Sequence, residues 1–358
     1  MNKKYRACVT GGCGFIGSAL VKELLKQGWD VEIVDNLSTG RLESLDGITL
    51  DKVTYCYPTR AFETFEELGG GLLGQDPEMV DYESTPESVL LMGICFTAES
   101  VLSRIADGRY DVIFHQAATP RVSYSVEHSL ETMQNNLMST TRLFKACADS
   151  NTPIVWASSS SVYAGAEQLP TPESARGLKC PRSPYAMHKY HCEDYARVFG
   201  ELYGLESVGL RYFNVYGPSQ PGDSPYATAV SAWCNAIKEG KECRSDGDGL
   251  QSRDMCYIDN VVQANVKAAQ ALLTRRIDGT EAPCYSIAHG ERTTNLEILD
   301  FLAARFGDRV KVRHAPERKG DVKHTHADIS RAREELGYEP TVYFWDGLER
   351  TLKWWKLE

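Results

Sequence analysis

Apolar positions near the start of the chain change between two spacings, which together predict a strand, a helix and a second strand. Residues 5–10 form a short apolar run, and a helical spacing follows over residues 15–27 and ends at Gly28. Residues 30–34 are then predicted to form a second strand. This order is typical of the first unit of a doubly wound parallel sheet.

The later part of the chain repeats this alternation of strands and helices. Residues 111–118 and 153–157 are apolar runs that suit buried parallel strands, with a helical pattern over residues 127–149 between them. Residues 208–212 predict another strand. Residues 50–93 show no clear period and predict an irregular insertion or a lid over a ligand. We therefore expect an α/β fold with a doubly wound parallel sheet.

A glycine-rich turn separates the first predicted strand from its helix. Gly11, Gly14 and Gly17 are spaced G-x-x-G-x-x-G. Glycines permit a tight turn and a close approach of the backbone to a diphosphate, and the helix N-terminus adds N–H donors. Asp35 follows the second strand, where its carboxylate would accept hydrogen bonds from ribose hydroxyls and repel a 2′-phosphate. These residues predict a dinucleotide site that prefers NAD to NADP.

A tyrosine and a lysine form a second candidate site. Ser183 and Pro184 are typical of a helix start, and Tyr185 and Lys189 then lie on one face of that helix. An ammonium beside a phenol favours the phenolate, so Lys189 would lower the pKa of Tyr185 and make it a general base. Serines at 158–161 end the strand before this helix, and one of their hydroxyls would share a substrate oxygen.

Composition and charge narrow the classes of partner. The net charge of −10 opposes a DNA or RNA partner, which needs a broad basic surface. No apolar run approaches the roughly 18 residues of a membrane span, and the first strand begins too early to leave room for a signal peptide. The 11 cysteines follow no Cys-x-x-Cys or Cys/His ligand spacing. We expect a cytoplasmic protein with no metal, nucleic-acid or membrane partner.

The chain resembles the extended short-chain dehydrogenases/reductases, and within them the NAD-dependent sugar-nucleotide epimerase/dehydratase family. The match covers nearly the whole chain apart from the insertion before Gly93. The matching segments are residues 10–17, 35–36, 115–118, 135–136, 158–163, Tyr185 with Lys189, 211–218, 247–249, 253–254, 257–259, Arg318 and 320–322.

The resemblance implies roles for individual residues. Ser159 matches the catalytic serine or threonine, Tyr185 the base, and Lys189 the residue that bonds the nicotinamide ribose. The implied cofactor-binding residues are Gly11, Gly14, Phe15, Ile16, Gly17, Asp35, Asn36, Ser38, Thr39, Gly40, Gln116, Ala117, Ala118, Asn136, Tyr185 and Lys189. The implied substrate-binding residues are Ser123, Ser159, Ser160, Asn214, Tyr226, Arg253, Arg318, Asp321 and Thr325. Among these, Asn214, Arg253 and Arg318 match positions that hold the substrate diphosphate.

The activity implied by the resemblance is C4 epimerisation of a UDP-sugar through a transient 4-keto sugar. Related dehydratases carry Asp-Glu where this chain has Ser160 and Ser161, which favours epimerisation. Thr325 matches a position where a residue smaller than tyrosine accompanies N-acetyl sugars. We therefore expect UDP-GlcNAc and UDP-GalNAc, or their uronic acids, as substrates. UDP-glucuronate or UDP-glucose is the alternative, although Ser123 stands where glucuronate epimerases usually carry arginine.

Further alternatives and expectations follow from the resemblance. A sugar-nucleotide reductase or dehydratase and a non-catalytic dinucleotide-sensing protein stay open. We expect a Rossmann lobe for NAD from residues 1–212, to which residues 256–284 return. Residues 213–255 and 285–358 are expected to form a smaller α/β lobe for the UDP-sugar. The resemblance also implies a homodimer.

Overall fold

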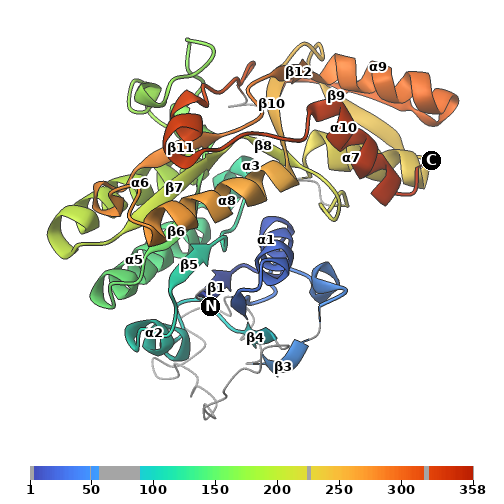
Figure 1. The fold of residues 1–358 in the computed structure, drawn as a ribbon. Coiled ribbons are helices and arrows are strands. Elements are labelled where there is room, and N and C mark those ends of the chain that lie inside the picture. Colours follow the sequence, from blue (N-terminus) through green and yellow to red (C-terminus); the bar gives the residue numbers. More distant parts are fainter. Residues whose placement is uncertain (1–3, 49, 56–88, 224–226, 318–321, 358) are drawn as a thin grey trace.

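The computed structural model describes residues 4–48, 50–55, 89–223, 227–317 and 322–357. An eight-stranded parallel sheet lies at its centre, in the order β11-β7-β6-β5-β1-β2-β4-β3 (Figure 1). The strands are β1 Arg6–Thr10, β2 Asp30–Val34, β3 Leu50–Tyr55, β4 Val89–Gly93, β5 Val112–His115, β6 Ile154–Ser159, β7 Ser207–Tyr212 and β11 Cys284–Ile287. The expectation of a doubly wound α/β fold is confirmed.

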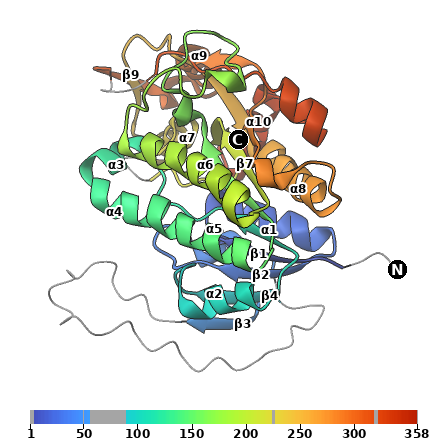
Figure 2. The same cartoon turned by 90° about the vertical axis from the view of Figure 1, so that its left-hand side faces the viewer.

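Helices cover both faces of this sheet. The helices are α1 Phe15–Lys26, α2 Glu99–Ala106, α3 Val122–Glu127, α4 Ser129–Met133, α5 Thr140–Asp149, α6 Pro184–Tyr203, α7 Ala229–Glu239, α8 Ile258–Leu273, α9 Asn295–Phe306 and α10 Phe344–Trp354. α1 and α8 pack on one face, while α2, α5 and α6 pack on the other, where Figure 2 shows α5 and α6 side by side. Alternate residues of β1 explain the two cores, because Val9 packs toward α1 and Cys8 toward α5.

Two small sheets lie beyond the carboxyl ends of the large one. One has the order β12-β10-β8, with β8 Asn214–Tyr216, β10 Ser252–Tyr257 and β12 Arg292–Thr294. The other pairs β9 Glu242–Asp246 with β13 Lys311–Ala315. The division into two lobes remains a prediction. Its expected boundary before residue 285 falls inside β11, which pairs with β7 in the large sheet.

One expectation about secondary structure was wrong. The stretch expected to be irregular contributes β4 and β3 to one edge of the sheet, while residues 56–88 lie outside the described part of the chain. The helix expected over about residues 127–149 is present as a continuous helical run from Ser129 to Asp149, made of α4, a π-helical turn at Gln134–Ser139 and α5. Within the described ranges, no helix is both long and apolar enough to cross a membrane.

Candidate active site

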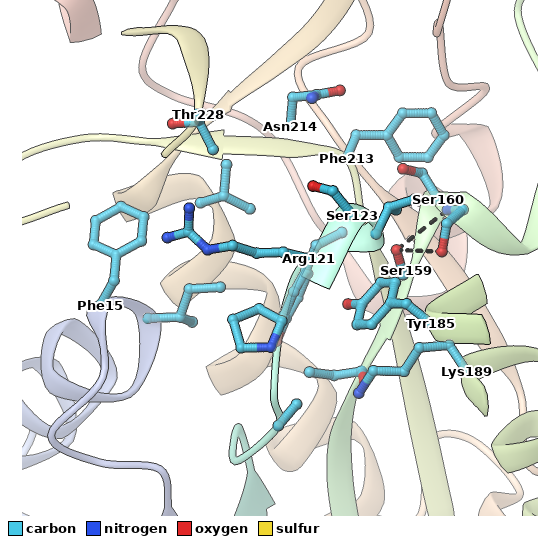
Figure 3. A pocket seen from close by; sticks show the side chains of 18 of the residues that line it. Phe15, Arg121, Ser123, Ser159, Ser160, Tyr185, Lys189, Phe213, Asn214 and Thr228 are labelled. Carbon is cyan, nitrogen blue, oxygen red and sulfur yellow. Dashed lines mark hydrogen bonds between the residues drawn. The ribbon is translucent and has the colours of Figure 1, made fainter. Parts of the chain in front are cut away.

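A cavity of about 1030 Å³ opens at the carboxyl ends of the central strands. Its lining comes from the N-terminus of α1, the ends of β5 and β6, the start of α6, and the small sheets with the N-terminus of α7 (Figure 3). Parallel strands direct their carboxyl ends to one edge, and ligands of open α/β sheets bind there. The cavity is therefore the candidate active site.

The glycine-rich turn has no room for a side chain at Gly11 or Gly17. Gly11 has φ +71°, and a Cβ there would lie 2.6 Å from the Ala117 nitrogen. A Cβ on Gly17 would lie 2.1 Å from the Gly11 oxygen. Gly14 caps α1 and has no side chain to occupy the first N–H groups of the helix. These groups stay available to an anion, as the spacing of the glycines predicts.

Asp35 is held at the cavity by the backbone. One carboxylate oxygen accepts the Cys13 N–H at 2.9 Å, and the other accepts the Leu37 N–H at 2.8 Å. Burial raises the pKa of Asp35, and these two hydrogen bonds lower it. Gly40 packs against the carboxylate, where a Cβ would lie 2.8 Å from it. The carboxylate therefore has a fixed orientation beside Asn36, Ser38 and Thr39, which line the cavity.

Ser159, Tyr185 and Lys189 meet at the other side of the cavity (Figure 3). β6 ends at Ser159, whose hydroxyl oxygen accepts hydrogen bonds from the Ser161 N–H at 3.2 Å and the Ser161 hydroxyl at 2.9 Å. The Ser183 hydroxyl accepts the Ala186 N–H and begins α6, as predicted. This helix start brings the tyrosine and lysine against the end of β6.

The electrostatics of the tyrosine differ from the expectation. Burial raises the pKa of Tyr185, and the group that lowers this pKa is Ser159, through a hydrogen bond. Burial also lowers the pKa of Lys189, whose ammonium donates to the Ala157 carbonyl oxygen at 2.7 Å. The sequence pattern suggested a direct effect of the lysine on the tyrosine. In the structure the serine takes that part.

A buried ion network under this site was missed by sequence reasoning. Glu193 accepts hydrogen bonds from the Ser158 hydroxyl at 2.6 Å, from Arg211 at 2.9 Å and from Arg176 at 2.7 Å. Both arginines thus neutralise the buried carboxylate of Glu193, which also binds Ser158, the residue before Ser159. The available signal was Glu193, one helical turn after Lys189, but its partners are distant in sequence.

Three of the four remaining cofactor candidates line the cavity. Gln116, Ala117 and Ala118 line the cavity. Asn136 does not belong to the lining. Its amide instead clamps Thr119, accepting the backbone N–H at 2.7 Å and donating to the carbonyl oxygen at 2.8 Å.

The described substrate candidates all lie at the cavity, Ser123 and Ser160 near Ser159 and the other three at the small sheets. Ser123, Ser160, Asn214, Arg253 and Thr325 all line the cavity. The Thr325 hydroxyl donates to the Asn214 side-chain oxygen at 3.4 Å and accepts the Asp254 N–H at 3.2 Å.

The other substrate candidates cannot be placed, and one further residue lines the cavity. Tyr226, Arg318 and Asp321 lie outside the described residues. Arg121, which sequence reasoning missed, also lines the cavity. In the described ranges no group of three or more His, Cys, Asp or Glu side chains could hold a metal ion.

The fold and this cavity are those of a dinucleotide-binding α/β protein, with a serine, a tyrosine and a lysine at the side of the cavity opposite the glycine-rich turn. Residues 7–277 match the NAD dependent epimerase/dehydratase family, and the chain belongs to that family. Its cofactor is therefore NAD, as the sequence predicts. The resemblance stated from the motifs is confirmed.

Three known proteins show how far the similarity extends. A UDP-glucose 4-epimerase from Mycolicibacterium smegmatis is 29% identical over 355 residues, with 98% of each chain covered. The structure of a UDP-N-acetylglucosamine 4-epimerase from Methanobrevibacter ruminantium in complex with UDP-N-acetylmuramic acid is 31% identical, with a TM-score of 0.80 and 99% of each chain covered. A UDP-glucose 4-epimerase from Thermus thermophilus in complex with NAD is 28% identical, with a TM-score of 0.76 and 98% and 99% covered.

Proposed function

We propose that this protein is an NAD-dependent UDP-sugar 4-epimerase that accepts N-acetylated sugars. The observation that carries the proposal is the meeting of Ser159, Tyr185 and Lys189 in the cavity that the glycine-rich turn also lines. The similarity to solved and curated UDP-sugar 4-epimerases supports it.

The chain's residues fit NAD on steric and electrostatic grounds. The turn at Gly11 and Gly17 leaves a cradle that a Cβ would fill, and Asp35 presents an oriented carboxylate where a ribose would lie. A 2′-phosphate would meet that negative charge. We therefore expect NADH to bind more tightly than NADPH in a fluorescence titration, and equal or tighter binding of NADPH would contradict this role of Asp35.

The side chains at the reacting end have separate tasks in the proposed reaction. Tyr185 removes the proton of the sugar 4-hydroxyl, and Ser159 donates a hydrogen bond to the same oxygen. Lys189 holds the nicotinamide ribose. The turn at Gly11 and Gly17 would hold NAD, which would supply the acceptor for a hydride from C4 and the donor that returns it to the other face of the keto sugar. Tyr185 then returns its proton to the oxygen.

The residues after Ser159 favour epimerisation over elimination. Elimination at C5 and C6 needs an acid and a base near the sugar, but the next two residues are Ser160 and Ser161. Neither hydroxyl is ionised at neutral pH, so neither removes a proton efficiently from carbon.

The substrate assignment rests on the other side of the cavity. Asn214, Arg253 and Arg318 are proposed to hold the diphosphate, because amide and guanidinium donors match phosphate oxygens. Thr325 leaves more space than a tyrosine, which favours UDP-GlcNAc and UDP-GalNAc or their uronic acids. UDP-glucuronate alone is the second candidate, and Ser123 in place of an arginine speaks against it.

The test is a panel of UDP-sugars incubated with the purified protein without added reductant. We expect UDP-GlcNAc and UDP-GalNAc to interconvert, with nuclear magnetic resonance showing inversion at C4 only. A deoxy or dehydrated product would contradict epimerisation, as would a need for stoichiometric reductant. Conversion of UDP-glucuronate alone would contradict the N-acetyl assignment.

We also propose a homodimer formed through α4 and α6. Several large apolar side chains on these adjacent helices are exposed in the single chain, namely Leu130, Met133, Tyr195, Val198 and Leu202. Three of them share one face of α6, and such a patch is typical of an interface. Light scattering should give the mass of a dimer for the parent and of a monomer for the double variant Val198→Glu, Leu202→Glu. A monomeric parent would contradict the proposal.

A further inference from the structure

Arg121 occupies a strained position in the loop between β5 and α3. Its backbone has φ +96° and ψ 120°, a conformation that residues with a Cβ rarely adopt. A glycine would adopt it without strain. Such strain persists where the surroundings impose it, and it gathers at ligand sites. The strain at Arg121 therefore indicates that its side chain has a function at this position.

The guanidinium of Arg121 is partly buried, and one of its nitrogens has no hydrogen-bond partner. Its Nη1 atom is buried and makes no hydrogen bond among the described residues. Other buried side-chain atoms share this condition, but only Arg121 also lines the cavity within the described ranges. Burial lowers the pKa of Arg121, and the charge of Asp223 raises it. An uncompensated buried cation costs free energy until an anion joins it.

The carboxylate that acts on Arg121 is already engaged. Asp223 accepts a hydrogen bond from Arg41 at 3.0 Å, and this pair is exposed. The negative charge of Asp223 is thus shared with a second arginine. It leaves the buried nitrogen of Arg121 without a hydrogen-bond acceptor.

The N-termini of two helices line the cavity that Arg121 also lines. In Figure 3 its side chain extends toward Phe15, the first residue of α1, and away from Ser159 and Tyr185. Thr228, which caps α7, lines the same cavity. Both helix N-termini carry partial positive charge, so they disfavour a nearby cation that has no anion.

We propose that Arg121 binds the diphosphate of the cofactor at the start of α1 and screens it from the diphosphate of the sugar nucleotide. The second part rests on the proposed function, which brings two diphosphates into one cavity. Their charges repel each other, and a cation between them reduces that repulsion. A carboxylate on the sugar is a poorer match, because the side chain of Arg121 extends away from the reacting end where the sugar would lie.

Three variants separate the effect of the Arg121 charge from that of its strained backbone and from that of an arginine elsewhere in the cavity. Arg121→Met removes the charge and keeps a Cβ, so the backbone strain stays. Arg121→Gly removes both the charge and the strain. Arg182→Met is the charge-matched control, because Arg182 lines the same cavity but is exposed.

Two binding measurements test the two parts of the proposal. The first is the rate at which the protein loaded with NADH releases it, followed by fluorescence. The second is the affinity of the protein, kept saturated with NADH, for UDP and for uridine, by calorimetry. For both Arg121 variants we expect NADH release about tenfold faster or more, because a charge-assisted hydrogen bond is lost. UDP affinity should fall several-fold, because the repulsion between the two diphosphates is no longer screened. Uridine affinity and the Arg182 control should stay near the parent.

The melting temperatures of the variants separate a loss of binding from a loss of folding. Arg121→Gly should melt at a higher temperature than Arg121→Met, because the strain is relieved, while both lose NADH equally. If the variant with the higher melting temperature also retains more NADH, the binding role of Arg121 is overturned. Unchanged NADH release overturns the first part, and unchanged UDP affinity overturns the screening. None of these readouts needs epimerase activity, so failure of the proposed function shows separately in the UDP-sugar panel.

Discussion

The two halves of the cavity are built in different ways. The cofactor half consists mainly of backbone, with a turn that excludes any Cβ at Gly11 and Gly17 and a carboxylate at Asp35 fixed by two N–H groups. The substrate half consists of side chains from separate elements, such as Asn214 on β8 and Thr325 beyond β13.

This difference teaches where change is tolerated. A backbone cradle fits one shape, so an added methyl group disturbs the whole turn. A wall of side chains can change its shape at one position while the fold stays intact. We therefore expect substitutions in the cofactor half to abolish function, and those in the substrate half to shift preference between sugars.

The largest effect is expected at Tyr185, where the two halves meet. Tyr185→Phe keeps the ring and removes the hydroxyl that takes the sugar proton. Turnover should fall about 10²–10⁴-fold, the usual contribution of a general base, while UDP affinity stays near the parent. Steady-state kinetics and calorimetry measure the two quantities. Turnover within about threefold of the parent would be inconsistent with Tyr185 as base.

The next effect tests the backbone cradle directly. Gly17→Ala places a Cβ 2.1 Å from the Gly11 oxygen, so the turn must move, and NADH affinity should fall about 100-fold. Gly14→Ala is the matched control, because its Cβ would lie 3.1 Å from the same oxygen. It should lose less. Equal losses in fluorescence titrations would show that the cradle is not the cause.

The same contrast explains what the sequence could predict. The glycine turn has a fixed spacing because Gly14 and Gly17 both lie against Gly11 within the same turn, and the buried strands have continuous apolar runs. β3 was missed because its sequence, LDKVTY, mixes charged and apolar residues at the sheet edge. Glu193 and Arg121 were missed because their surroundings come from distant segments. Only the tertiary structure brings Arg211 to Glu193, or leaves Arg121 without an acceptor.

A smaller effect is expected from Ser159, whose hydrogen bond lowers the pKa of Tyr185. Ser159→Ala removes that bond, so the pKa of Tyr185 rises. Because the base acts as phenolate, activity should need a higher pH, and the rising limb of the pH profile of kcat/KM should move upward. The rate near neutral pH should fall about 10–100-fold. Ser161→Ala, which removes a donor to Ser159, should give a smaller shift in the same direction. A profile with an unmoved limb would contradict this electrostatic role.

The smallest effect is expected at Thr325 in the substrate half. Thr325→Tyr adds a ring beside Asn214, in the space proposed for the N-acetyl group when the keto sugar turns. The ratio of kcat/KM for UDP-GlcNAc to that for UDP-glucose should fall about tenfold, because added bulk rejects the larger sugar more strongly. Thr325→Val keeps the size and loses the hydroxyl, so it should leave the ratio near the parent. If the tyrosine variant leaves the ratio unchanged, Thr325 does not select the sugar. If the valine variant shifts it as far as tyrosine does, the hydroxyl and its hydrogen bonds act instead of size.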